Sequence, residues 1–281
     1  MIVANRPARI KRSSLADSLS ACGLVLGDTA LVHSDLFAMG PVEGNQEDML
    51  PTYYQGFWDV LGEDGTLVVP GYFYEYGRWQ TPYDTKRSPV SSELGIFSQY
   101  VNNQTGRFRS LNPLTALTAI GGKGQYLCGG GTGSAYGVDS PWDRLLSCNG
   151  KIIFVGVDLQ VMTFVHFVEH MVGVPHLYSK FFAVPVLEDG QPVDISIYSQ
   201  VRYLDFDVEY NLEGLTSEFE SANILQTAEV GRGKIRCVTA RDAFDFLKDK
   251  LKQDPFYLLT QPPKFVAGQI PMDGAAGPAR A

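Results

Sequence analysis

One short segment of the sequence, TFVHFVEHMV at residues 163–172, combines residue types that can move protons. Its apolar residues recur at the spacing of one helical face, which predicts an amphipathic helix. Thr163, His166 and His170 fall on the opposite face, with Glu169 at its margin. Histidine titrates near neutral pH and a carboxylate can orient its ring, so this face can supply a general base. An ordinary solvated helix face is the alternative interpretation.

Two kinds of chemistry fit this pattern. His166-x-x-Glu169-His170 matches the HxxEH pattern of zinc metallopeptidases, in which two histidines four residues apart bind the metal and the glutamate is the general base. The third ligand would come from downstream, where the acidic run at 205–209 offers candidates. The other interpretation is acyl transfer, in which a histidine takes the proton of an attacking amine. No GxSxG elbow occurs, which favours direct attack on a bound acyl donor over a covalent intermediate.

The sequence carries no strong signature for nucleotide or metal binding elsewhere. The run GGGTGS at residues 129–134 is interpreted as a flexible loop, because no GxxxxGK[ST] occurs and no strand-plus-helix context supports a dinucleotide fingerprint. The cysteines lie far apart without a CxxC pair, which predicts reduced thiols in a cytoplasmic protein. They are Cys22, Cys128, Cys148 and Cys237.

Composition narrows the class of protein further. The chain has 281 residues, of which 44% are apolar and 19% charged, and a net charge of −8. An acidic chain argues against a dedicated nucleic-acid binder. No apolar stretch approaches the roughly 20 residues that span a bilayer, and the basic N-terminus has no apolar segment behind it. We therefore expect a soluble globular protein with neither a nucleic-acid nor a membrane partner.

Strand and helix patterns alternate along the chain. Buried strands are predicted at 29–33, 66–70, 117–121 and 151–157, and helices at 15–23, 47–61, 93–102, 163–172 and 241–252. Residues 71–92 show no clear period and are interpreted as a long loop. Asp189-Gly190 lies between two alternating runs and predicts a hairpin. Without a repeat or linker, the chain predicts one α/β domain with a mixed sheet.

Six segments, in order, resemble the aminoglycoside 3-N-acetyltransferase family, which uses acetyl-CoA. They are GLVLGDTALVHSDLFAMGPVEG (23–44), GEDGTLVVPGY (62–72), SPVSSELGIF (88–97), RSLNPLTALTAIG (109–121), GVDSPWDRLL (137–146) and IIFVGVDLQVMTFVHFVEHM (152–171). Six segments in the right order are more specific than HxxEH, so the resemblance favours acyl transfer over a zinc peptidase. It implies a three-layer α/β sandwich in a single domain over residues 1–267, a flexible tail over 268–281, and no metal.

The resemblance also implies roles for individual residues. The family's T-x-x-H-x-x-E motif falls on Thr163, His166 and Glu169, as a donor near the thioester, the general base, and its partner. The family's VHSSL loop, which contacts the pyrophosphate and pantetheine of CoA, corresponds to residues 32–36. The cofactor-binding residues implied in this way are His33, Ser34, Asp35, Leu36, Phe37, Gly40, Val42, Thr66, Arg109 and Ser110.

Four positions depart from the family pattern and bear on CoA binding. They are Asp35 for a serine, Asn45 for a glycine, Asn112 for a histidine and Ala116 for a serine. For the CoA phosphates, Arg107 and Arg109 are candidate cations and the loop at 40–44 can offer N–H groups, although a solvated arginine pair is an equal alternative.

The acceptor is left open by the sequence. RSxNP, together with Val174-Pro175 and Lys180-Phe181, resembles family members from surface-polysaccharide gene clusters. The resemblance therefore implies an amino-sugar acceptor, either nucleotide-linked, in a glycan, or an aminoglycoside. A non-catalytic binding protein that kept the fold is a third class, and the sequence also allows a homo-oligomer.

Overall fold

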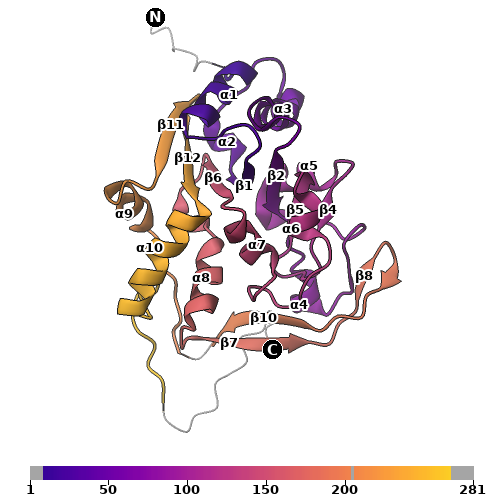
Figure 1. Cartoon of the computed structure of the whole chain (residues 1–281), viewed down its shortest axis with the longest axis vertical. Helices are drawn as coiled ribbons and strands as arrows, with labels where there is room; N and C mark the ends of the chain where they lie inside the picture. Colours follow the sequence, from indigo (N-terminus) through magenta and orange to yellow (C-terminus); the bar gives the residue numbers. More distant parts are fainter. Residues whose placement is uncertain (1–8, 204–205, 267–281) are drawn as a thin grey trace, which may run out of the picture.

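The computed structural model describes residues 9–203 and 206–266, and a seven-stranded mixed sheet forms its centre (Figure 1). The strand order is β11-β12-β6-β1-β2-β5-β4. The three inner strands β6, β1 and β2 are parallel, whereas β12 and β5 flank them antiparallel. The strands are β1 (Thr29–Ser34), β2 (Thr66–Pro70), β4 (Phe108–Arg109), β5 (Leu117–Gly121), β6 (Lys151–Val155), β11 (Gln226–Val230) and β12 (Gly233–Thr239).

Helices cover both faces of this sheet, because the inner strands are apolar on both sides. In β1, Ala30 and Val32 pack into one hydrophobic cluster and Leu31 into the other. The first face is covered by α1 (Arg12–Ala21), α2 (Leu36–Met39), α3 (Met49–Leu61) and α5 (Gly95–Asn102). The second is covered by α6 (Gly124–Cys128), α7 (Pro141–Ser147), α8 (Phe164–Val172), α9 (Leu215–Ser221) and α10 (Ala240–Gln253). The predicted three-layer α/β sandwich is confirmed.

Two small sheets lie beside the central one. β7 (Leu177–Phe182) pairs antiparallel with β10 (Ile197–Arg202), and β8 (Val186–Glu188) forms a hairpin with β9 (Gln191–Pro192). The turn of this hairpin contains Asp189 and Gly190 with positive φ angles, which confirms the hairpin prediction. A short strand, β3 (Tyr83–Asp84), runs parallel to β8.

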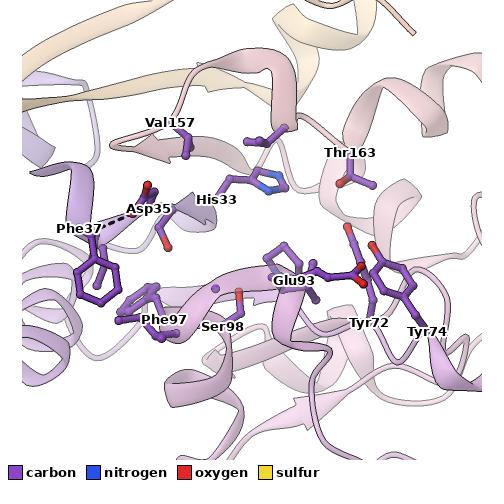
Figure 2. A pocket seen from close by; sticks show the side chains of 17 residues that line it. His33, Asp35, Phe37, Tyr72, Tyr74, Glu93, Phe97, Ser98, Val157 and Thr163 are labelled. Atoms are coloured by element: carbon purple, nitrogen blue, oxygen red, sulfur yellow. Dashed lines mark hydrogen bonds between the residues drawn. The ribbon is translucent and has the colours of Figure 1, made fainter. Parts of the chain in front are cut away.

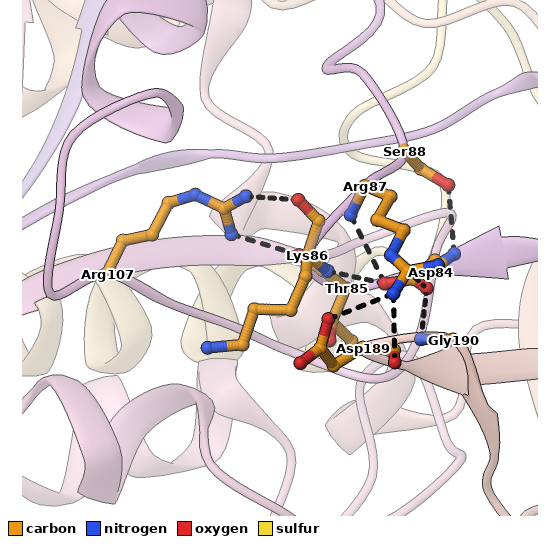
Figure 3. A network of polar contacts seen from close by, with 8 residues as sticks. All are labelled: Asp84, Thr85, Lys86, Arg87, Ser88, Arg107, Asp189 and Gly190. Carbon is orange, nitrogen blue, oxygen red and sulfur yellow. Dashed lines mark hydrogen bonds and ion pairs between the residues drawn. The ribbon is translucent and has the colours of Figure 1, made fainter.

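Residues 71–92, predicted as a long loop, are more ordered than this expectation. The segment contains β3 and a short helix, α4 (Glu75–Trp79). Its order comes from tertiary contacts, because buried Tyr76 and Tyr83 donate hydrogen bonds to the carbonyls of Val184 and Ser110. Figure 3 shows how the hairpin turn is held: Asp84 accepts a hydrogen bond from the Gly190 amide at 2.7 Å, and Arg87 forms an ion pair with Asp189.

Three single-turn helices complete the described secondary structure: η1 (Gln46–Asp48), η2 (Ser92–Leu94) and η3 (Leu159–Val161). Within residues 9–203 and 206–266, no helix is both long and apolar enough to cross a membrane. The predicted flexible tail at 268–281 lies outside the described residues.

Candidate active site

The carboxyl ends of β1 and β6 mark a switch point in the sheet. After β1 the chain enters α2 and α3 on one face, and after β6 it enters α8 on the other. Ligands of open α/β sheets bind in the crevice that such a divergence leaves. A cavity of about 500 Å³ occupies this position (Figure 2), and we call it the donor cavity. Its lining includes His33, Ser34, Asp35, Leu36, Phe37, Tyr72, Tyr74, Glu93, Val157 and Thr163.

Asp35 caps a helix at the wall of the donor cavity. Its Oδ1 accepts hydrogen bonds from the amides of Phe37 at 3.0 Å and Ala38 at 3.3 Å, which satisfies the first N–H groups of α2. The side chain thus has a structural partner, and this accounts for a carboxylate in the loop that follows β1.

His33 presents unused hydrogen-bonding capacity in the same wall. The residue is 7% exposed, its ring stacks on Phe154, and its Nε2 has no hydrogen-bond partner in the described part of the chain. Burial lowers the pKa of His33 to about 4, so the imidazole is neutral at physiological pH. His33 therefore adds a neutral side chain to the wall of the donor cavity.

A cluster of polar side chains around Glu169, which we call the Glu169 cluster, lies on α8. The Glu169 carboxylate contacts Nδ1 of His166 at 2.7 Å and Nε2 of His176 at 2.9 Å, and it accepts a hydrogen bond from the Tyr210 hydroxyl at 3.0 Å. Burial acts to raise the pKa of Glu169, but hydrogen bonds and charges from the two histidines outweigh it and lower that pKa. The carboxylate therefore stays ionised at neutral pH.

The prediction that Glu169 lies at the margin of an outward polar face is wrong. Glu169 is completely buried, because Tyr210 and the segment after the helix fold over it. His166 is the member that reaches solvent, with its side chain one third exposed. Since Nδ1 of His166 is bound to Glu169, Nε2 is the nitrogen left for a substrate.

His166 opens onto a small cavity of about 170 Å³, which we call the acceptor cavity. Its ring lies edge-on to Tyr210, with centroids 4.9 Å apart, and 6.3 Å from the ring of Tyr136. Thr163, one helical turn earlier, lines the donor cavity. Residues at the start of α8 therefore line both cavities. The acceptor cavity is lined by Tyr136, His166, Leu177, Gln200, Arg202 and Tyr210.

The family profile described as aminoglycoside 3-N-acetyltransferase matches residues 31–252. This range includes the carboxyl ends of β1 and β6 and the whole of α8. The chain belongs to the aminoglycoside 3-N-acetyltransferase family. Family membership places it among the N-acetyltransferases.

Curated and solved relatives agree over most of the chain. Aminoglycoside N(3)-acetyltransferase VII of Streptomyces paromomycinus is 29% identical over 268 residues, covering 84% of this chain and 90% of its own. Aminoglycoside N(3)-acetyltransferase III of Pseudomonas aeruginosa is 22% identical, covering 83% and 90%. A solved structure of AAC-IIIb with CoASH has a TM-score of 0.76 at 24% identity and covers 91% of this chain and all of that one. AAC-VIa bound to sisomicin has a TM-score of 0.75 at 21% identity, covering 88% and 98%.

The residues of the HxxEH pattern do not converge in this member of the aminoglycoside 3-N-acetyltransferase family. Nδ1 of His166 contacts Glu169, whereas Nδ1 of His170 contacts the Gln200 amide at 2.8 Å. Among the residues that the structure describes, no group of three or more histidine, cysteine, aspartate or glutamate side chains is placed to hold a metal ion.

Three of the implied CoA-binding residues are not part of the lining of the donor or acceptor cavity. Arg109 is 4% exposed and donates to the carbonyls of Gly71, Ser88 and Pro89. Thr66 and Ser110 are also buried, and their hydroxyls accept hydrogen bonds from the amides of Lys123 and Leu117. All three brace the backbone around β2, β4 and β5.

Arg107 is likewise engaged with the backbone. Figure 3 shows its guanidinium donating to the carbonyls of Thr85 and Lys86. Because these arginines are occupied by main-chain carbonyls, the expectation that Arg107 and Arg109 meet the CoA phosphates has no support from their positions.

The other implied residues divide between two adjoining cavities. His33, Ser34, Asp35 and Leu36 line the donor cavity, whereas Gly40 and Val42 line a neighbouring one of about 420 Å³ together with Asn45. Phe37 lines both. Asn112 lies elsewhere and donates to the carbonyls of Gly133 and Tyr198, while Ala116 is buried in the core.

Sequence reasoning missed His176 and Tyr210. His176 is completely buried against Glu169, and Tyr210 comes from a segment read only as acidic and polar. Both lie outside the periodic part of α8, so no helical spacing links them to Glu169. Gly173 and the dipeptide Val174-Pro175, just before His176, are local signals that the helix ends there.

Proposed function

We propose that the chain transfers the acetyl group of acetyl-CoA to an amino group of an amino sugar, with His166 as general base. The observation that carries this proposal is the hydrogen bond between His166 and the buried Glu169, placed one helical turn from a residue of the donor cavity. A histidine oriented by a carboxylate is the arrangement that proton abstraction from an amine requires.

The thioester arm of the donor is assigned to the donor cavity. The neutral side chains of His33 and Ser34 suit the uncharged pantetheine, and the Thr163 hydroxyl lies toward the His166 end. Figure 2 shows Tyr72, Tyr74 and Thr163 gathered at one end of this cavity, away from Phe37. The acetyl carbonyl would therefore lie near Thr163, where a hydroxyl can donate to its oxygen.

The chemistry follows from the Glu169 cluster. Glu169 holds the His166 proton on Nδ1, so the lone pair of Nε2 faces the acceptor. The acceptor amine attacks the thioester carbon while Nε2 takes an amine proton, and the C–S bond breaks from the tetrahedral intermediate. The proton then passes to the departing thiolate, which leaves an amide and free CoA. His176 and Tyr210 keep the Glu169 carboxylate in position throughout.

We further propose that an amino sugar joined to a nucleotide or a glycan is a better acceptor than an aminoglycoside. Tyr136 and Tyr210 in the acceptor cavity offer ring faces to a sugar. Arg202 is the permanently charged residue in the lining of that cavity. Its positive charge repels the several ammonium groups of an aminoglycoside.

The loop aromatics between Tyr72 and Tyr83 divide in their positions. Tyr72 and Tyr74 line the donor cavity, whereas Tyr76 and Tyr83 are buried in the core. Trp79 is 62% exposed and lines neither cavity. We therefore assign stacking of the acceptor to the acceptor cavity and not to this loop.

Binding and turnover test the proposal separately. Acetyl-CoA at about 100 times its dissociation constant should stabilise the fold by about 2.7 kcal/mol, whereas NAD, ATP and zinc should not. Free CoA release should depend on an amino-sugar acceptor and exceed the rate with kanamycin-type compounds. No thermal shift at millimolar acetyl-CoA would contradict the donor, and faster turnover of kanamycin would contradict the acceptor preference.

A further inference from the structure

The cavity beside the donor cavity carries the opposite charge. The charged residues that line the donor cavity are acidic, Asp35 and Glu93, whereas those of the neighbouring cavity are Arg9 and Arg232. The two cavities adjoin at Phe37, whose side chain is 57% exposed. An uncharged thiol arm suits the first cavity, and phosphate groups suit the second, which we call the basic cavity.

Backbone geometry fixes Arg232 at the basic cavity. Gly231 and Arg232 form the two-residue turn between β11 and β12, with a positive φ at Gly231. The Arg232 amide donates to the Met39 carbonyl at 2.9 Å, which ties this turn to the end of α2. A Cβ at Gly40 would lie 2.9 Å from the Arg232 Nε, so a glycine there allows the guanidinium to lie against the backbone.

The two arginines differ in how they are held. Arg9 donates through Nη1 to the carbonyls of Val42 and Gly44, which anchors it on the loop after α2. In the part of the chain that the structure describes, the Arg232 guanidinium forms no hydrogen bond or ion pair. It is therefore a cation already placed in a cavity and without an anion.

The acidic residues of the same loop have other partners. Asp48 accepts a hydrogen bond from the Asn45 amide at 2.7 Å, and Glu43 lies 3.8 Å from Lys11. No acidic residue belongs to the lining of the basic cavity as described. Both charged residues of this lining are therefore cationic although the whole chain is acidic.

We propose that Arg9 and Arg232 bind the 3′-phosphate at the adenosine end of the acetyl donor and so select a 3′-phosphorylated donor. This inference rests on the proposed function, which assigns the thioester end to the donor cavity. A phosphate monoester carries a charge of about −1.5 to −2 at neutral pH, and a guanidinium can bind two of its oxygens at once. Arg107 and Arg109 line neither the donor cavity nor the basic cavity.

A binding experiment tests the basic cavity without any turnover. Adenosine 3′,5′-bisphosphate should raise the melting temperature of the protein, adenosine 5′-monophosphate should leave it unchanged, and Arg232→Gln should abolish the difference. Lys234→Gln removes the same charge from an exposed position on β12 outside the cavity lining and should keep the difference. Equal shifts for both nucleotides in the unmodified protein would overturn the inference.

A kinetic experiment separates this inference from the proposed function. The KM for 3′-dephospho-acetyl-CoA should exceed that for acetyl-CoA about tenfold, which corresponds to about 1.4 kcal/mol. Arg232→Gln and Arg9→Gln should each bring the two values together. Acetyl transfer with equal KM values in the unmodified enzyme overturns the phosphate site alone. Absence of acetyl transfer from either donor, with the bisphosphate still bound, refutes the proposed function and supports the phosphate site.

Discussion

The donor cavity and the Glu169 cluster lie at the two ends of the first turn of α8, and they are built in different ways. The donor cavity is an open space lined by side chains from three strand ends and α5, and few of these side chains contact one another through hydrogen bonds. The Glu169 cluster is closed, and its carboxylate contacts three other side chains at 2.7 to 3.0 Å. Many independent contacts suit binding, whereas a few interdependent ones suit proton transfer. Substitutions in the first should therefore change KM, and substitutions in the second should change kcat.

The largest effect is expected for His166→Ala. Losing a general base costs about 10²- to 10⁴-fold in rate, so kcat should fall by this factor while the KM for acetyl-CoA stays nearly constant. The side chain is partly exposed, so water can replace its contact with Glu169 and the loss of stability should be small, unlike at the fully buried His176. Steady-state kinetics with each substrate varied in turn would measure both quantities.

His170→Ala is the matched control on the same helix. Its ring contacts Gln200 and not the Glu169 cluster, so kcat should stay close to that of the unmodified enzyme. If His170→Ala were as inactive as His166→Ala, and both variants lost bound zinc, acyl transfer by a single base would be refuted in favour of the metal.

A smaller effect is expected for His176→Phe, which removes one donor from the buried carboxylate. Leaving part of a buried polar group unsatisfied costs about 1–3 kcal/mol, so the free energy of unfolding should fall by that amount. The kcat value should fall less than in His166→Ala, because His176 positions Glu169 and does not touch the acceptor.

Rescue distinguishes positioning from packing at this site. His176→Gln keeps an N–H donor in reach of Glu169, so it should recover kcat relative to His176→Phe. Equal kcat in both variants, with equal loss of stability, would show that His176 only fills space.

How far the sequence predicts the molecule differs between the same two regions. Strands β1, β2 and β6 are short apolar runs that can be recognised from the local sequence. Because β1 and β6 are parallel neighbours, the residues that follow Val32 and Val155 lie at the same edge of the sheet. Resemblance to the family then points to His33 and Ser34, which the structure places in the donor cavity. Local pattern and family motif suffice where a site is built from strand ends.

The Glu169 cluster could be recognised only from the tertiary structure. Glu169 itself follows from the family motif, but its burial depends on His176 and Tyr210, which come from other segments. The positions of Thr66, Arg109 and Ser110 have the same cause. A motif match predicts that these residues matter, and only the packing shows that they brace the strands.

On the donor side, Ser34→Leu should raise the KM for acetyl-CoA more than it lowers stability. Ser34 ends β1 and lines the donor cavity, so a larger apolar side chain takes up space meant for the donor. Ser110→Ala is the matched control: it should cost some stability through the lost bond to the Leu117 amide and leave the KM unchanged. A Ser34→Leu protein that unfolds readily yet keeps its donor affinity would contradict the assignment of this loop.

The smallest expected effect is an acid-dependent loss of stability from Glu169. Its pKa is lower in the folded protein than in the unfolded chain, where a glutamate titrates near about 4.3. Folding therefore gains stability from the ionised carboxylate above that value and loses it as the pH falls through the lower, folded pKa. Glu169→Gln cannot ionise, so melting temperatures of the two proteins should differ most at neutral pH and converge toward pH 3. Because other carboxyl groups such as Asp84 also have lowered pKa values, only the difference between the two proteins isolates Glu169. A gap in melting temperature that stays constant from pH 7 to pH 3 would show that the hydrogen bonds of the cluster, and not the charge of Glu169, hold it together.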